Sequence, residues 1–254
     1  MLKFSANLWY LFYEWEMMDR FGVSAKAGFK AVEFHFPYQW SANSLAQKLS
    51  ENGLEQVLIN APAGNWEAGE RGIAGLSGRH NEFQDTIGLA LEYALALDCP
   101  NIHIMAGLNG DKDIFAENIT YAANLCASNN IKVLTEALNP IDFPDYLISN
   151  TQEALKVVDI VNHKSFLLLY DIYHGIQNND DILQTIKDNL NFIGHMQAAS
   201  APGRHEPDHK ASYNFSMLFK SLEKLDYTGW IGCEYIPRDK TINGLGWAKN
   251  FGIN

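Results

Sequence analysis

The segment Lys132–His174 decides the fold class, and it reads KVLTEALNPIDFPDYLISNTQEALKVVDIVNHKSFLLLYDIYH. It begins with a short β-rich run, Lys132–Leu138, and ends with a second one, Phe166–His174. Between them, Thr151–Asn162 repeats apolar residues at the three- and four-residue spacing of a helix. Two parallel strands in one sheet need such a crossover, so the segment predicts a βαβ unit.

The same alternation extends outward from this unit in both directions. Six further β-rich runs are expected at Leu2–Leu8, Ala31–Pro37, Glu55–Pro62, Asn101–Gly107, Phe192–Ala199 and Trp230–Pro237. Seven further helical patterns cover Glu16–Gly28, Ser41–Gly53, Asn81–Asp98, Asp113–Asn129, Asp181–Leu190, Phe215–Asp226 and Gly244–Phe251. Eight strands alternating with helices in 254 residues correspond to about 32 residues per repeat. The pattern therefore predicts an α/β fold, a (β/α)8 TIM barrel that forms a single domain over residues 1–254.

Helix boundaries and the first strand support this prediction. Gly28 and Gly53 stand where a helix would close in a left-handed turn, and Ser41 and Thr151 stand at expected N-cap positions. The alternative is a doubly wound open sheet, which usually carries a Gly-rich phosphate-binding turn after its first strand. The corresponding stretch, Ser5–Tyr10, contains no glycine.

Composition limits the classes of partner. The net charge is −11, whereas a nucleic-acid-binding protein normally needs a basic face, so no nucleic acid is expected. An acidic shell also repels anions at long range, so an acidic substrate must be held by local cations or a metal.

Cysteine usage and the N-terminus suggest a cytoplasmic location. Cys99, Cys126 and Cys233 are odd in number, form no C-x-x-C pair and lie in predicted strands or helices, which is typical of reduced, buried thiols. The apolar N-terminus soon meets Glu14 and Glu16, which argues against a signal peptide. No apolar run approaches the length of a membrane span.

Four predicted strands end in an oxygen-bearing side chain. Glu136, Asp171, Gln197 and Glu234 are separated by 35, 26 and 37 residues, about one βα unit each. They therefore come from the fifth to the eighth strand, whose ends converge on one half of the rim of a barrel. Buried carboxylates need a counter-charge, and this hard oxygen set favours Mg²⁺ or Mn²⁺ over Zn²⁺. Any one acid alone is explained equally well by an ion pair, but four in phase favour a metal site.

Histidines near the strand ends are additional candidates. His174 follows Asp171 by three residues and is expected to orient a substrate hydroxyl or a metal ligand. His195 precedes Gln197 by two residues on the same strand face, so it is interpreted as a histidine of the core. His35 and His103 are interpreted as hydrogen-bonded polar neighbours of the site.

Two long irregular segments, 61–79 and 199–213, follow predicted strands and should lie on the catalytic face. They carry Arg71 and Arg204, whose planar guanidinium groups suit a substrate carboxylate, and Glu206 joins Arg204 as a substrate-binding candidate. An ion pair within the loop explains either arginine equally well. An aromatic run after the first strand could exclude water from the site, or could belong to the core or to the interface of a homo-oligomer: Trp9, Tyr10, Phe12, Tyr13 and Trp15.

Motifs spread over nearly the whole chain carry a family resemblance. They are FSANL (4–8), AVEF (31–34), PAG (62–64), AGERGI (68–73), YDIYH (170–174), GHMQ (194–197), GRHEP (203–207) and GWIGCEY (229–235). With them the chain resembles the hydroxypyruvate isomerase family, within the xylose-isomerase-like barrels.

This resemblance implies a metal held by Glu136, Asp171, Gln197 and Glu234. It also implies that Glu136 and Glu234 act as proton donor and acceptor in the interconversion of hydroxypyruvate and 2-hydroxy-3-oxopropanoate (tartronate semialdehyde). A close branch isomerises the four-carbon acid 2-oxo-tetronate, and the stretches 91–97 and 135–138 lean towards that branch. The segments 198–200 and 207–212 depart from the family pattern after the seventh strand, which leaves substrate size open.

Three other functions remain as alternatives. A ketose 3-epimerase shares the barrel and the two carboxylates, but such enzymes generally place a histidine where Gln197 stands. A barrel endonuclease needs a multi-zinc cluster and a cationic groove, which the charge of −11 disfavours. A non-catalytic sugar-acid binding protein would keep the barrel and the metal without turnover.

Overall fold

The computed structural model describes all 254 residues and confirms the predicted barrel. Eight parallel strands close in sequence order, with β1 paired to β8. They are β1 (Lys3–Asn7), β2 (Ala31–Phe34), β3 (Glu55–Asn60), β4 (Asn101–His103), β5 (Lys132–Glu136), β6 (Phe166–Asp171), β7 (Ile193–Gln197) and β8 (Trp230–Cys233).

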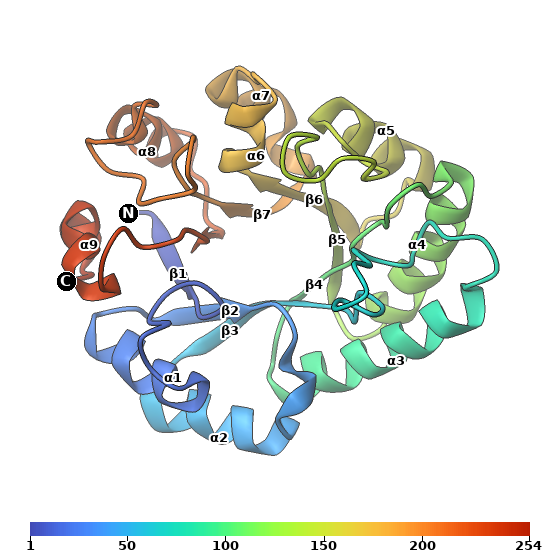
Figure 1. Cartoon of the computed structure of the whole chain (residues 1–254), viewed down its shortest axis with the longest axis horizontal. Coiled ribbons are helices and arrows are strands. Elements are labelled where there is room, and N and C mark those ends of the chain that lie inside the picture. The colour runs from blue at the N-terminus through green and yellow to red at the C-terminus, as the bar shows by residue number, and fades with distance from the viewer.

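Helices surround the strands in the order in which the chain supplies them (Figure 1). The α-helices are α1 (Met17–Lys26), α2 (Ala42–Asn52), α3 (His80–Ala96), α4 (Lys112–Ala127), α5 (Thr151–Val161), α6 (Ile172–Gln177), α7 (Ile182–Asn189), α8 (Phe215–Lys224) and α9 (Thr241–Gly244). Short 3-10 helices occupy η1 (Pro37–Gln39), η2 (Leu190–Phe192) and η3 (Leu245–Phe251). None of the helices combines the length and apolar character that a membrane span requires.

The predicted helix signals are mostly confirmed. Ser41 caps α2 by accepting the backbone N–H of Ser44, and Gly53 ends that helix in the left-handed conformation. The prediction of Thr151 as an N-cap is wrong, because the Asn150 side chain caps α5 by accepting from Glu153. Asparagine, like serine, has a short side-chain oxygen that reaches the free N–H groups of the first turn.

The predicted strands extend further towards the C-terminus than the observed strands. The run Phe166–His174 is divided into β6 and α6. Asp171 ends the strand and caps the helix, since its Oδ1 accepts the backbone N–H of Tyr173 at 2.8 Å. His174 therefore lies in the first turn of a helix, directly above the strand end, rather than on the strand.

The apolar core comprises one cluster of 65 buried side chains between the strands and helices, and a small cluster of Leu58, Leu134 and Leu169. All three cysteines are free and buried, as predicted. The long segments after β3 and β7 lie beside the strand ends: Gly72 pairs with Ala106 beyond β4, and Ser200 pairs with His205. The polar side chains that end β5 to β8 thus open towards these two loops.

Candidate active site

A small pocket of about 80 Å³ lies at the carboxyl ends of the strands. Its wall combines aromatic and ionisable side chains from both halves of the barrel: Trp9, Tyr10, His35, Asn60, Trp66, His103, Met105, Glu136, Leu138, Phe143, His174, Gln197, Arg204 and Glu234. Trp9 stacks on His35, with ring centroids 5.3 Å apart, and thereby closes one side of the pocket. An apolar pocket with a few convergent polar groups is the usual form of a small-molecule site.

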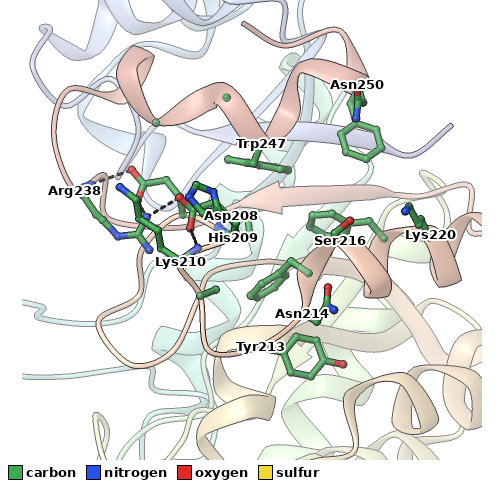
Figure 2. Close-up of a pocket in the computed structure, with 18 of the residues that line it drawn as sticks. Asp208, His209, Lys210, Tyr213, Asn214, Ser216, Lys220, Arg238, Trp247 and Asn250 are labelled. Carbon is green, nitrogen blue, oxygen red and sulfur yellow. Dashed lines mark hydrogen bonds and ion pairs between the residues drawn. The ribbon is translucent and has the colours of Figure 1, made fainter.

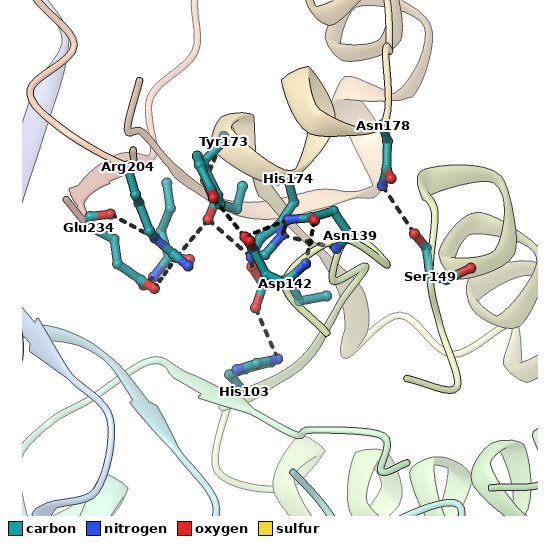
Figure 3. Close-up of polar contacts among 12 residues, drawn as sticks. His103, Asn139, Asp142, Ser149, Tyr173, His174, Asn178, Arg204 and Glu234 are labelled. Carbon is teal, nitrogen blue, oxygen red and sulfur yellow. Dashed lines mark hydrogen bonds and ion pairs between the residues drawn. The ribbon is translucent and has the colours of Figure 1, made fainter. Parts of the chain in front are cut away.

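Two buried carboxylates, from β5 and the end of β8, line this pocket, and a third, at the end of β6, lies beside it. Arg204 joins two of them, donating from Nη2 to Asp171 Oδ2 at 3.0 Å and to Glu234 Oε1. Its guanidinium lies 4.8 Å from the ring centroid of Tyr173 and 5.4 Å from that of Tyr10. Figure 3 shows Arg204 and Glu234 facing each other beside Tyr173. One cation therefore offsets part of the negative charge of the cluster.

The three carboxyl groups differ in their electrostatic surroundings. Burial raises the pKa of Glu136 well above its ordinary value, and the charges of Asp171 and Glu234 raise it further. Burial also raises the pKa of Asp171, to about 7, although Arg204 opposes the shift. Burial alone would raise the pKa of Glu234, but Arg204 and His35 outweigh it and lower this pKa to about 2. Such divergent carboxyl pKa values are typical of acid–base pairs.

His174 points its Nε2 atom towards the carboxylates, 3.8 Å from Glu136 Oε1 and 3.7 Å from Asp171 Oδ2. Its Nδ1 atom accepts the backbone N–H of Asn139 at 3.0 Å (Figure 3). A backbone N–H can only donate, so the neutral ring carries its proton on Nε2. Burial lowers the pKa of His174 well below its ordinary value, which keeps the ring neutral. His174 therefore presents an N–H donor to the pocket.

Polar atoms without partners mark this part of the pocket. Glu136 Oε1, His174 Nε2 and His103 Nε2 are buried and make no hydrogen bond in the protein. Ligand atoms of Glu136, Asp171 and His174 lie within 4.8 Å of one another, close enough to hold a metal ion. Buried polar groups are rarely left unsatisfied, so these atoms fit a site that receives a cation and a polar substrate.

Gln197, at the end of β7, reaches the same cluster. Its Nε2 atom donates to Glu33 Oε1 at 2.8 Å and to Glu234 Oε2. Glu33 itself, a buried acid of β2, was not among the predicted site residues. Its signals in the sequence were its place as a single acid between Val32 and Phe34 and its position in the motif AVEF (31–34).

Two of the predicted substrate-binding residues lie away from the pocket wall. Arg71 covers Trp66, its guanidinium carbon 3.8 Å from the ring centroid, and donates to the backbone carbonyls of Trp66 and Glu70. Glu206 is buried but accepts from Arg238, at 2.9 Å to the side chain and 3.0 Å to the backbone. Both residues hold loops in place around the site, whereas Arg204 and His174 line the pocket.

A larger hollow of about 1180 Å³ lies apart from the acid cluster, between α8 and the C-terminal segment. Figure 2 shows Arg238, Asp208, Lys210 and His209 at one end and Trp247 and Asn250 towards the other. Its charged groups are largely paired with one another, as Arg238 is with Asp208 at 2.9 Å. The hollow lacks the convergent buried acids of the smaller pocket.

A family model described as xylose isomerase-like TIM barrel matches residues 21–251. The chain belongs to this family. It is 42% identical over 256 residues to a protein of Pectobacterium atrosepticum named 2-oxo-tetronate isomerase, with 98% of this chain and 97% of the relative covered. It is 41% identical to a hydroxypyruvate isomerase of Escherichia coli, with 99% and 100% covered.

Among solved structures of the family, one from Brucella melitensis, named an AP endonuclease of family 2, superposes with a TM-score of 0.97. It is 43% identical, and 99% of this chain and 100% of that chain are covered. The predicted resemblance to the hydroxypyruvate isomerases is confirmed by these full-length relatives.

Proposed function

We propose that this protein is an isomerase of short hydroxy-oxo acids, interconverting hydroxypyruvate and 2-hydroxy-3-oxopropanoate through an enediolate. The observation that carries the proposal is the pair Glu136 and Glu234, two buried carboxyl groups in one small pocket with oppositely shifted pKa values. Moving a carbonyl to the neighbouring carbon requires one group that accepts a carbon-bound proton and one that returns it. Full-length relatives named as isomerases of such acids support this reaction type.

In the direction from hydroxypyruvate, Glu234 accepts the proton from C3, since Arg204 keeps this carboxylate ionised. Glu136 delivers a proton to C2 from its Oε1 atom, which is buried and has no hydrogen-bond partner in the protein. The hydroxyl hydrogen is redistributed between the two substrate oxygens, so no atoms are gained or lost. In the reverse direction the two carboxyl groups exchange these tasks.

The donor set fits a divalent cation held by Glu136, Asp171, Gln197 and Glu234. Three carboxylates and one amide oxygen are hard ligands, which favours Mg²⁺ or Mn²⁺. His174 is better suited to donate its Nε2–H to a substrate oxygen than to ligate, because Asn139 occupies Nδ1. A bound cation would act as a Lewis acid towards the charge that develops on the substrate oxygens.

Substrate binding falls to Arg204 and His174 in this proposal. Arg204 Nη1 makes no hydrogen bond within the chain, although the residue lines the pocket, so it remains available to a substrate oxygen. Arg71 and Glu206 contribute at a distance, by holding the loops after β3 and β7. The aromatic rings of Trp9 and Trp66 limit access of water.

A second candidate substrate is the four-carbon acid 2-oxo-tetronate. Three relatives at 41–42% identity bear the name of that isomerase, and the E. coli hydroxypyruvate isomerase is equally similar. A nuclease activity, suggested by the name of the Brucella relative, is disfavoured by the net charge of −11, which would repel a phosphate backbone.

Turnover by the purified protein tests the proposal directly. Hydroxypyruvate, 2-oxo-tetronate and free ketoses are supplied in D₂O, with and without a chelator, and deuterium incorporation is followed by NMR. We expect incorporation next to the carbonyl of one acid, and its loss with chelator. Exchange only at C3 of a ketose would instead indicate an epimerase, and an inert protein that retains a sugar acid would indicate a binding protein.

A further inference from the structure

Glu33 reaches from β2 into the interior of the barrel and receives four side-chain donors. Ser5 Oγ and His195 Nε2 each lie 2.8 Å from its Oε2 atom. Asn7 Nδ2 and Gln197 Nε2 donate to Oε1 at 3.2 and 2.8 Å. The side chain is 1% exposed, so this carboxylate is fully enclosed by groups from β1 and β7. The proposed proton transfers do not use it.

The two amides among these donors link Glu33 to the catalytic carboxylate Glu234. Asn7 Nδ2 also donates to Glu234 Oε2, at 3.0 Å, and Gln197 Nε2 donates to the same oxygen. An amide nitrogen has two hydrogens, and those of Gln197 are both used by these acceptors. The orientation of the Gln197 amide is thereby fixed, with Oε1 as the atom left for a ligand.

The backbone of β8 makes room for this arrangement. Gly232 lies in register with Gln197 on one side and Ser5 on the other. A Cβ atom at Gly232 would approach Glu33 Oε1 to 2.2 Å and Oε2 to 2.5 Å. A glycine inside a strand often marks such a close approach. The Glu33 carboxylate therefore occupies space that a side chain on β8 would otherwise fill.

We infer that Glu33 is a positioning residue that turns the Gln197 amide so that its oxygen, not its nitrogen, faces the divalent cation. A carboxylate only accepts hydrogen bonds, so it selects the nitrogen end of the amide and leaves the oxygen for the metal. This inference rests on the proposed function, because it needs Gln197 to be a metal ligand. Replacing a residue that orients a metal ligand commonly lowers the affinity for the metal by about 10–100-fold.

Binding of Mn²⁺ to the metal-free protein, measured by the electron paramagnetic resonance signal of the free ion, tests the inference without turnover. We expect Glu33→Gln to weaken Mn²⁺ binding by about 10–100-fold. Asp180→Asn is the matched control, since Asp180 also accepts two side-chain hydroxyls, from Thr151 and Tyr170, but lies outside the pocket. This control should bind Mn²⁺ like the wild type.

A further variant tests the position of the Glu33 carboxylate separately from its charge. Gly232→Ala displaces the Glu33 carboxylate without changing any ligand, so it should weaken Mn²⁺ binding in the same direction. It also provides the reading if Glu33→Gln does not fold.

Wild-type binding that neither Glu33→Gln nor Gly232→Ala weakens would overturn the inference and leave the metal site standing. A loss of affinity in Glu33→Gln with none in Gly232→Ala would also overturn it, because the position of the Glu33 carboxylate would then not matter. A wild-type protein that binds no Mn²⁺ would overturn the proposed metal chemistry, and the inference with it.

Discussion

Glu136 and Glu234 are the same residue type, yet their surroundings give them opposite proton affinities. Arg204 contacts Glu234 but not Glu136, and Glu136 Oε1 has no hydrogen-bond partner. The position of one guanidinium therefore distinguishes a group suited to donate a proton from one suited to accept it. This difference would be lost if either side chain were made a neutral amide.

Glu136→Gln and Glu234→Gln should each lower kcat by about 10²-fold or more, because each removes one partner of the proton transfer. The substitution keeps the size of the side chain, so circular dichroism and thermal unfolding should still report a folded barrel. The measurement is steady-state turnover of whichever acid the wild type isomerises. A near-wild-type kcat for either variant would exclude that residue from proton transfer.

Arg204→Met should move the acid limb of the pH profile of kcat/KM to higher pH. Arg204 lowers the pKa of Glu234, so its removal raises that pKa, and the base is then protonated over a wider acidic range. The control is Lys112→Met, which removes a surface ion pair with Glu153 and should leave the profile in place. An unshifted acid limb in Arg204→Met would mean that Arg204 does not set the ionisation of the base.

At the scale of single residues, the sequence predicts which side chains stand at the ends of β5 to β8. It does not predict what those side chains contact. Glu136, Asp171, Gln197 and Glu234 are identifiable because each follows an apolar run at the expected spacing. Glu33 is not, because its partner Gln197 lies on β7 and becomes a neighbour of β2 only when the barrel closes. Distances across a barrel depend on its shear and on how the side chains pack inside it. A pattern of residue types along the chain does not specify either one.

At the scale of elements, the β3–α3 loop is attached to the pocket by a backbone contact. Gly72 has a φ angle of +105°, and a Cβ atom there would lie 2.2 Å from the carbonyl oxygen of Met105, a pocket residue. Gly69, in the same loop, has a φ angle of +92° but no atom within 4 Å of its Cβ position. Both glycines have a positive φ angle, but only at Gly72 would a Cβ atom collide with a neighbouring residue.

Gly69→Ala should therefore cost about 1–3 kcal/mol of unfolding free energy, from backbone strain alone. Gly72→Ala should cost more, and it should raise KM, because the loop must move away from Met105. Urea unfolding and substrate titration measure the two effects. Equal stability and equal KM in the two variants would show that the loop contact does not shape the pocket.

The boundary between β6 and α6 illustrates what local patterns leave undetermined. Ile172 and Tyr173 favour a strand, so the apolar run extends to His174. The structure ends the strand at Asp171, because that side chain caps the following turn. A capping hydrogen bond outweighs a weak β preference. The chain therefore turns into α6, which places His174 over the pocket.

At the scale of the whole molecule, the barrel was predictable because eight repeats of strand and helix each bury their own apolar face. Closure then brings Asn7 of β1 beside Glu234 at the end of β8, 227 positions later in the chain. This closure determines which strand-end side chains meet, whereas loop side chains such as Trp66 and Phe143 form other parts of the pocket wall. The repeat pattern does not determine how far those loops extend over the pocket.

For the whole protein, the stabilisation that a bound metal provides should depend on pH. Asp171 has a raised pKa of about 7 in the metal-free protein, so its contribution to folding stability is greatest at low pH and is lost as pH rises through that value. A divalent cation binds the ionised form of Asp171 and must displace its proton. Saturating Mn²⁺, at about 100 times its Kd, should add about 2.7 kcal/mol, and a fixed Mn²⁺ concentration should raise Tm more at pH 8 than at pH 6. The measurement is thermal unfolding at both pH values with Mn²⁺ or chelator, and a Tm increase that is equal or larger at pH 6 would contradict carboxylate binding of the metal.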